Sequence, residues 1–149
     1  MNEFPIAPAT SRYLWFLIPV FAVLVAALVL IVVSVRGSRF ARFEVRSDAL
    51  ALHGDLYGRV IPKTQLRLEL ARRVNLVVET ALRPQSRRMG TALPGYQAGW
   101  FRLANGEKAL VYLTDRTKAV YIPTTVNYSL LLSPLDPDAF LARLRGLRS

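Results

Sequence analysis

The sequence has no cysteine and a single histidine, His53. It therefore lacks the residues for a disulfide framework and for the usual zinc sites, which are built from several Cys and His side chains. No G-x-S-x-G or comparable nucleophile motif accompanies His53, so a Ser-His-Asp triad has no support. We expect no catalytic residues, no metal site and no cofactor, and a structural or exposed role for His53.

Charged residues are missing from one long stretch near the start, "YLWFLIPVFAVLVAALVLIVVSV", residues 13–35. At about 1.5 Å per residue, a helix of this length reaches roughly 34 Å, slightly more than a hydrocarbon core of about 30 Å. We predict a short tail over residues 1–12 and a transmembrane helix over residues 13–35. Tyr13 and Trp15 are expected in the aromatic belt at one membrane interface.

A cleaved signal peptide is the alternative interpretation of this stretch. It would need a basic start, an apolar run of roughly 7 to 15 residues and a cleavage site of small residues. Here Glu3 accompanies Arg12 in the leader, the apolar run is longer, and the following "SVRGS" carries a charge. The pattern favours a retained anchor.

Acidic residues are scarce, with 10 Asp and Glu against 20 Lys and Arg, a net charge of +10. Arg12 alone precedes the apolar stretch, whereas four basic residues follow it within a dozen positions: Arg36, Arg39, Arg42 and Arg46. Cytoplasmic flanks of membrane spans carry the excess of basic residues. We therefore predict a basic juxtamembrane segment over residues 36–42 and a cytoplasmic carboxyl-terminal domain.

The excess of basic residues also limits the kinds of partner. Each basic side chain held near an anionic leaflet gains about 1 kcal/mol. Two arginine pairs, Arg72-Arg73 and Arg87-Arg88, are candidates for bidentate contact with anionic lipid headgroups. The alternative, which we weight more heavily, is that they are solvated residues of loops and strand edges. Nucleic acid is not expected, because no recognition motif appears and the basic residues are spread out.

After residue 36, short segments with a period of two alternate with Gly, Pro, Asn and Asp steps, which is typical of an antiparallel sheet. Residues 66–80 are interpreted as a strand, an irregular piece and a second strand. Residues 81–95 are interpreted as a polar loop entering another short strand. Further strands are expected within residues 39–45, 48–54, 57–61, 118–123 and 127–133.

The stretch "GYQAGWFRLANGEKALVYLT", residues 95–114, raises the question of a phosphate-binding loop. Both common phosphate motifs require a helix directly after their glycines. Gly95 and Gly99 do not meet this requirement, because "WFRLA" after Gly99 has the pattern of a strand. The Asn105-Gly106 step instead predicts a two-residue type I′ turn between two strands.

This turn type predicts the pairing of the two strands. Trp100 would lie opposite Val111, and Phe101 opposite Leu110. Trp100 would then lie on the face opposite to that of Phe101, covered by a neighbouring element such as the terminal helix, or by a partner.

The last segment, "SPLDPDAFLARLRGL", changes to a helical period. Asp136 is a favourable N-cap and Pro137 suits the first helical position. Leu141, Leu144 and Leu147 fall on one face. We predict an amphipathic helix over residues 136–147.

Several of these segments together resemble one known family. The residues 95–114 quoted above, "VYIPT", "LLLSPLDPDAFLARL" and the upstream "FEVRSDALALHGDLYGRVIP" are similar to the bacterial pleckstrin-homology-like (PH-like) domain family of small membrane proteins. The resemblance covers roughly Phe43 to Leu147. It implies a bent antiparallel barrel of about seven strands, capped by the terminal helix. The phosphoinositide motif of eukaryotic relatives is not visible, so no lipid specificity is implied.

The combined prediction is a mainly β protein: a transmembrane helix followed by a PH-like domain over residues 43–149. We expect a single-pass protein of the bacterial inner membrane, acting as a non-catalytic module that binds a protein partner, the anionic membrane surface, or both. Two alternatives stay open. One is a homo-oligomeric assembly protein, and the other is a non-catalytic subunit of an envelope enzyme or transporter.

Overall fold

The computed structural model describes residues 12–54 and 56–148. The chain divides into two units, Met1–Val35 and Arg36–Ser149. Most of the tail expected over residues 1–12 lies outside the described residues.

The first element is α1, Arg12–Phe40, a helix of 29 residues that contains Pro19. Within it, Leu14–Val33 has a mean hydropathy of 3.3, so this helix is long and apolar enough to cross a membrane. Trp15 is 77% exposed. Tyr13 and Arg39 belong to the helix, but their side chains are outside the described set.

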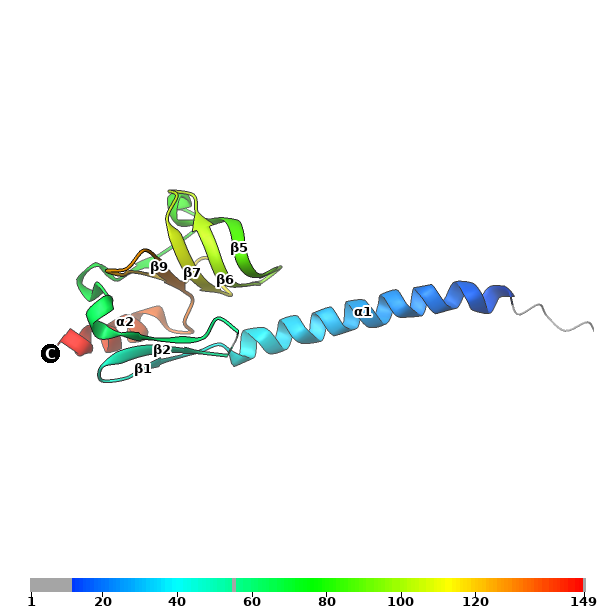
Figure 1. The fold of residues 1–149 in the computed structure, drawn as a ribbon, viewed down its shortest axis with the longest axis horizontal. Helices are drawn as coiled ribbons and strands as arrows, with labels where there is room; N and C mark the ends of the chain where they lie inside the picture. The colour runs from blue at the N-terminus through cyan, green and yellow to red at the C-terminus, as the bar shows by residue number, and fades with distance from the viewer. Residues whose placement is uncertain (1–11, 55, 149) are drawn as a thin grey trace, which may run out of the picture. The chain divides into compact units, whose positions relative to one another are not determined.

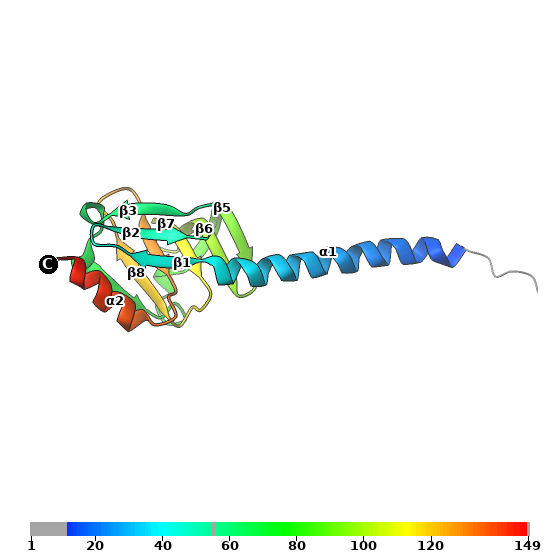
Figure 2. The same cartoon turned by 90° about the horizontal axis from the view of Figure 1, so that it is seen from below.

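The folded unit begins with a three-stranded antiparallel sheet in the order β1-β2-β3 (Figure 2). Its strands are β1 (Arg42–Val45), β2 (Ala49–His53) and β3 (Arg59–Pro62). The strands β1 and β2 lie within segments expected to be strands, and β3 extends one residue beyond its expected end, to Pro62.

A six-stranded sheet follows, in the order β4-β8-β9-β7-β6-β5, and Figure 1 labels β9, β7, β6 and β5. Its members are β4 (Arg72–Val74), β5 (Pro84–Leu93), β6 (Tyr96–Leu103), β7 (Lys108–Leu113), β8 (Ala119–Pro123) and β9 (Ser129–Leu132). Every pair is antiparallel except β7 with β9, which run parallel. The described residues thus form nine strands rather than about seven, and one pair departs from the expected antiparallel pattern.

Two regions differ from their prediction, residues 66–80 and residues 84–93. Within the first, β4 lies at Arg72–Val74, where the irregular piece was expected, and residues 75–80, expected to be the second strand, form turns instead. Leu66–Leu70 is not a strand: Leu66 makes one isolated bridge to Thr124, and Leu68–Leu70 form a 3-10 turn. Leu66 and Leu68 are buried while Leu70 stays half exposed, so the period-two leucines do not mark a sheet face. Residues 84–93, predicted as mostly loop, form the edge strand β5, in which residues 85–88 are polar and exposed.

Further short 3-10 turns connect these elements at Lys63–Gln65, Thr80–Leu82 and Gly146–Arg148.

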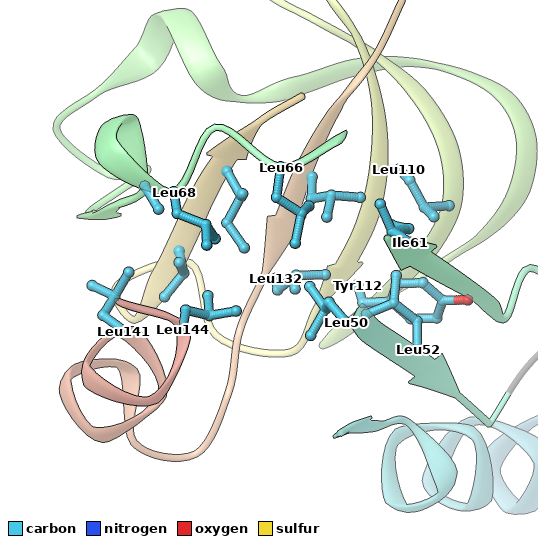
Figure 3. Close-up of a cluster of buried hydrophobic side chains, with 14 of the residues drawn as sticks. Leu50, Leu52, Ile61, Leu66, Leu68, Leu110, Tyr112, Leu132, Leu141 and Leu144 are labelled. Carbon is cyan, nitrogen blue, oxygen red and sulfur yellow. The ribbon is translucent and has the colours of Figure 1, made fainter. Parts of the chain in front are cut away.

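The main hydrophobic core lies between the two sheets and the terminal helix (Figure 3). The three-stranded sheet contributes Leu50, Leu52 and Ile61, all at most 2% exposed. These side chains point toward residues of the six-stranded sheet such as Leu132. Burying apolar surface stabilises a fold by about 25 cal/mol per Å², so this core makes the main stabilising contribution.

A second core covers the other face of the six-stranded sheet. Phe101 and Leu103 of β6 pack there with Leu76 and Leu82 from the segment between β4 and β5. Backbone hydrogen bonds from Ala104 and Asn105 to this segment hold it in place. Both faces of β6 and β7 are therefore apolar, as expected.

The terminal helix α2 runs over Pro137–Arg145 and contacts β4 and β8. The Asp136 carboxylate accepts hydrogen bonds from the backbone N–H groups of Asp138 and Ala139 at 3.1 and 3.0 Å. This satisfies two of the first-turn donors that a helix cannot bond internally. Leu141 and Leu144 then reach the main core.

The turn at Asn105-Gly106 differs from the prediction by one residue. Leu103 and Glu107 flank a three-residue loop in which the Gly106 N–H donates to the Leu103 carbonyl at 2.9 Å. Gly106 alone of this loop has positive φ, +90°, which is the pattern of a type I turn followed by a glycine bulge. The predicted type I′ turn needs positive φ at Asn105 as well, and Asn105 does not have it.

This change of turn moves the strand pairing. Trp100 lies opposite Leu110, and Phe101 opposite Ala109. A one-residue shift exchanges the sheet faces. Trp100 therefore shares a face with Leu110 in the main core, whereas the predicted register gave that face to Phe101.

The two remaining glycines of the stretch also have defined places. Gly95 follows Pro94 in the two-residue connection from β5 to β6 and has φ +79°, which suits a type II turn. Gly99 lies opposite Gly90 of β5, where the two backbones approach closely. A Cβ on Gly99 would lie 2.4 Å from the Met89 carbonyl oxygen.

Candidate functional site: a basic groove around Trp100

Trp100 is half-buried in the middle of β6 and packs against Tyr128. The two rings are nearly perpendicular, with centroids 5.0 Å apart. The Thr124 hydroxyl donates to the Tyr128 carbonyl, which fixes the loop that carries this tyrosine. The aromatic ring that packs against the indole therefore comes from the loop before β9.

Two cations from different strands lie over the Trp100 ring. The guanidinium carbon of Arg59, on β3, is 5.0 Å from the ring centroid. The Lys108 Nζ, on β7, is 4.4 Å from it. Each contact contributes about 0.5–1 kcal/mol at an exposed site. Two like charges on one ring create a local positive potential that an anion would reduce.

No carboxylate among the described ion pairs neutralises these two cations. Glu107 precedes Lys108 in the chain, but its carboxylate accepts hydrogen bonds from Tyr121 at 2.7 Å and Ser129 at 3.1 Å. Burial raises the pKa of the Tyr121 hydroxyl, so this residue stays a donor at neutral pH. Glu107 is thus engaged elsewhere.

A cavity of about 490 Å³ opens beside Trp100. Its lining combines three cations with apolar side chains: Arg88, Met89, Trp100, Phe101, Arg102 and Lys108. We call this cavity, together with Arg59 over the indole, the Trp100 groove. The groove can accept a ligand that is both acidic and partly apolar.

The strand pairing explains why these residues meet. Met89 lies opposite Trp100, and Arg102 opposite Lys108, and directly opposed residues share a sheet face. A bulge between Arg87 and Met89 makes Arg88 the extra residue of β5 and re-aims its side chain. Met89 is 62% exposed, a large apolar side chain at the open edge.

The structure separates the two arginine pairs singled out from the sequence. Arg72 and Arg73 lie on β4 and Arg87 and Arg88 on β5, at opposite edges of the six-stranded sheet. Arg72 donates two hydrogen bonds to Glu79, at 2.8 and 2.7 Å. These bonds lower the pKa of Glu79 and raise that of Arg72.

Arg73 donates instead to Asp138 of α2, at 3.1 Å. Each member of the first pair therefore has a carboxylate partner of its own. Arg88 of the second pair lines the Trp100 groove, and Arg87 lies beside it on the exposed strand.

Sequence reasoning missed Arg59, Arg102 and Lys108 as site residues. The signal that could have found two of them was the hairpin register, because the three-residue loop places Arg102 opposite Lys108 on the Trp100 face. The predicted register placed Arg102 opposite Ala109 instead. Arg59 comes from another sheet, and no local pattern connects it to Trp100.

A larger cavity, about 650 Å³, lies elsewhere in the domain and includes Arg42 in its lining. Its walls carry charges of both signs, Asp115 as well as Lys118. The Thr114 and Ser133 hydroxyls at its rim lie 3.0 Å apart and bond each other. This cavity lacks the single-sign charge of the Trp100 groove. Arg36, the other flanking arginine whose side chain is described, is exposed.

His53 has the kind of role expected for it. Its Nε2 lies 3.0 Å from the Glu44 carboxylate on the exposed side of the first sheet. Hydrogen bonds from Arg46 and then from His53 lower the pKa of Glu44. Within residues 12–54 and 56–148, no three His, Cys, Asp or Glu side chains form a metal-binding group.

Two packed sheets closed by a carboxyl-terminal helix define a small β domain of the pleckstrin-homology type. Residues 42–148, well over half of the chain, match the family model described as Bacterial PH domain. The chain therefore belongs to the bacterial PH domain family, as the sequence resemblance implied. Domains of this type are generally non-catalytic interaction modules. No curated protein and no solved structure matches the chain.

Proposed function

We propose that this protein is a single-pass, membrane-anchored interaction module, whose cytoplasmic PH domain binds an acidic partner and performs no catalysis itself. The observation that carries the proposal is the Trp100 groove. It places Arg59, Arg88, Arg102 and Lys108 around one indole without a neutralising carboxylate among the described ion pairs.

The anchor is supported by α1. Its apolar part, Leu14–Val33, has 20 residues, which at about 1.5 Å per residue matches a hydrocarbon core of about 30 Å. The excess of basic residues after this span supports a domain on the cytoplasmic side of the bacterial inner membrane. Anchoring would keep the basic domain beside an anionic leaflet.

Charge substitutions in the span test the anchor. Each arginine near the centre of a transmembrane helix costs about 2.5–3.5 kcal/mol of insertion free energy. We expect the double variant Leu24→Arg, Leu28→Arg to leave the membrane fraction after an alkaline carbonate wash. The matched variant Leu24→Ala, Leu28→Ala should stay with the wild type. An arginine variant retained as well as wild type would contradict the anchor.

A reporter enzyme fused after Ser149 tests the orientation. We expect activity from a reporter that works only in the cytoplasm. Activity from one that works only in the periplasm would instead place the domain on the outer side.

Self-assembly is a second candidate function, because β5 is an edge strand of ten residues with a neighbour on one side only among the described strands. Such an edge can pair with another copy. Arg87 and Arg88 oppose this, since two β5 strands would bring like charges together. A protein mass well above 16.7 kDa in detergent, after subtraction of the bound detergent, would support assembly, and a monomer would remove it.

A further inference from the structure

We propose that the Trp100 groove binds an extended acidic segment of a partner protein, with one apolar side chain between two carboxylates. This inference rests on the interaction function proposed above and makes its partner specific. Three features of the groove carry it: the spread of its cations, its apolar floor, and the lack of a competing carboxylate among the described ion pairs.

The three cations that line the cavity are spread across the sheet, although Lys108 and Arg59 both reach the Trp100 ring. Arg88, Arg102 and Lys108 come from three adjacent strands, β5, β6 and β7. Neighbouring strands lie about 4.8 Å apart, so the backbones that carry Arg88 and Lys108 are separated by roughly 10 Å. A single phosphate group spans less than this distance, whereas two carboxylates along a peptide can match it.

The floor between these cations is apolar. Met89 and Trp100 lie directly opposite each other, and the Met89 side chain is 62% exposed. In an extended peptide, every second side chain points to the same face, and residues i and i+4 lie roughly 13 Å apart. A Glu-x-apolar-x-Glu segment therefore places its apolar residue over Met89 and Trp100. Its two carboxylates then fall near Arg88 on one side and Lys108 with Arg59 on the other.

Charge selects this occupant over a second copy of the chain. The strand β5, "PQSRRMGTAL", contains Arg87 and Arg88 and no acidic residue. Acidic side chains on a partner would be stabilised by charge-assisted hydrogen bonds, which arginine makes in bidentate form with carboxylates. A second basic strand would be repelled.

The test uses the full chain in neutral detergent micelles with Trp15→Phe, so that Trp100 is the only tryptophan. The probe is the capped peptide Ser-Glu-Thr-Leu-Thr-Glu-Ser, and binding is followed by Trp100 emission. We expect saturable binding that weakens about tenfold or more when both glutamates become glutamine, or when leucine becomes serine.

Matched protein variants locate the site. We expect Arg59→Glu, Lys108→Glu to weaken peptide binding by about tenfold or more. The same change of charge at Arg143→Glu, Arg145→Glu, on the exposed face of α2, should change it less than about twofold. Urea unfolding of both variants checks that the domain stays folded.

Other outcomes separate this inference from the general function. Equal weakening by both variant pairs would overturn the groove as the site and leave acidic binding by the domain intact. A third outcome is that the protein fails to bind the peptide but binds phosphatidylglycerol vesicles, and that Arg59→Glu, Lys108→Glu abolishes vesicle binding. This result would overturn the peptide proposal and assign the groove to lipid. No binding of either probe would contradict the acidic-partner function as well.

Discussion

Gly99→Ala should destabilise the domain strongly, because Gly99 lies opposite Gly90 where β5 and β6 approach closely. The new Cβ would lie 2.4 Å from the Met89 carbonyl oxygen and 2.6 Å from the Gly90 Cα. Both are backbone atoms, so no side chain can rotate away. Gly99 also has φ +119°, a conformation that L-residues rarely adopt.

The expected magnitude has two parts. A non-glycine residue in such a conformation costs about 1–3 kcal/mol, and overpacking of a filled space costs about 1–3 kcal/mol. We therefore expect Gly99→Ala to lower the free energy of unfolding by about 2–6 kcal/mol. With a typical denaturant slope, the urea midpoint should fall by about 1 M or more.

Two other glycines serve as controls for the two parts. Gly106 has φ +90°, and a Cβ added there would have no other atom within 4 Å, so Gly106→Ala should show the conformational cost alone, about 1–2 kcal/mol. Gly146 has φ −61° and open space, and Gly146→Ala should be neutral or stabilise by about 0.4–1 kcal/mol.

The assay is urea unfolding of the full chain in neutral micelles, followed by Trp100 emission in the Trp15→Phe background. If Gly99→Ala costs no more than Gly106→Ala, the close approach of β5 and β6 is absent and the reasoning fails.

Two further predictions concern the N-cap of α2 and the surface ion pair between Arg72 and Glu79. Asp136→Ala should lower the free energy of unfolding by about 1 kcal/mol, because it leaves two first-turn N–H groups of α2 without their acceptor, and a value near zero in urea unfolding would remove the cap. Arg72 lowers the pKa of Glu79, so the ion pair stabilises the fold above the unfolded-state pKa of about 4.3, and this contribution is lost as pH falls through the lower folded-state pKa. Because both side chains are at least 36% exposed, the ion pair should contribute less than about 1 kcal/mol to the free energy of unfolding. Glu79→Gln should make the free energy of unfolding less dependent on pH over this acidic range. An unchanged pH dependence would contradict the pairing.

The general class of the fold could be predicted from the sequence because its signals are local. The apolar stretch, the period-two segments and the capped terminal helix each depend on residues close together in the chain. Asp136 followed by Pro137 is enough to predict where α2 begins. These signals and the family resemblance led to the same mainly β domain.

The hairpin register could not be predicted from the Asn-Gly step alone. Asn105-Gly106 suits both a two-residue type I′ turn and a three-residue loop with a glycine bulge. Both faces of β6 and β7 are apolar, so the hydrophobic pattern does not decide between the two pairings. Backbone hydrogen bonds from Ala104 and Asn105 to Arg83 and Ala81 accompany the observed loop. Those partners are more than twenty positions earlier in the chain.

The edge strand β5 was missed for a related reason. Its side chains are mostly exposed and polar, so "RPQSRRMG" has the composition of a loop. Its strand conformation depends on pairing with β6, and its close approach depends on Gly90 opposite Gly99. The parallel pairing of β7 with β9 is likewise a tertiary feature.

The candidate site could be predicted only in part. Arg88 and Trp100 were both singled out, but for different roles. Their meeting with Arg59 and Lys108 depends on the corrected register and on contact between two sheets. Arg72 and Arg73 looked equivalent to Arg87 and Arg88 in sequence, yet their carboxylate partners, Glu79 and Asp138, are supplied by the fold.

The most direct test of the central claim, that the Trp100 groove is the interaction surface, is site-specific photo-cross-linking in native membranes. A photoreactive amino acid replaces Arg102 in the groove or Arg143 on α2. We expect position 102 to give a discrete cross-linked product that disappears in the Lys108→Glu background, and position 143 to give none. The same products from both positions, or a product from position 102 that Lys108→Glu leaves unchanged, would contradict the account.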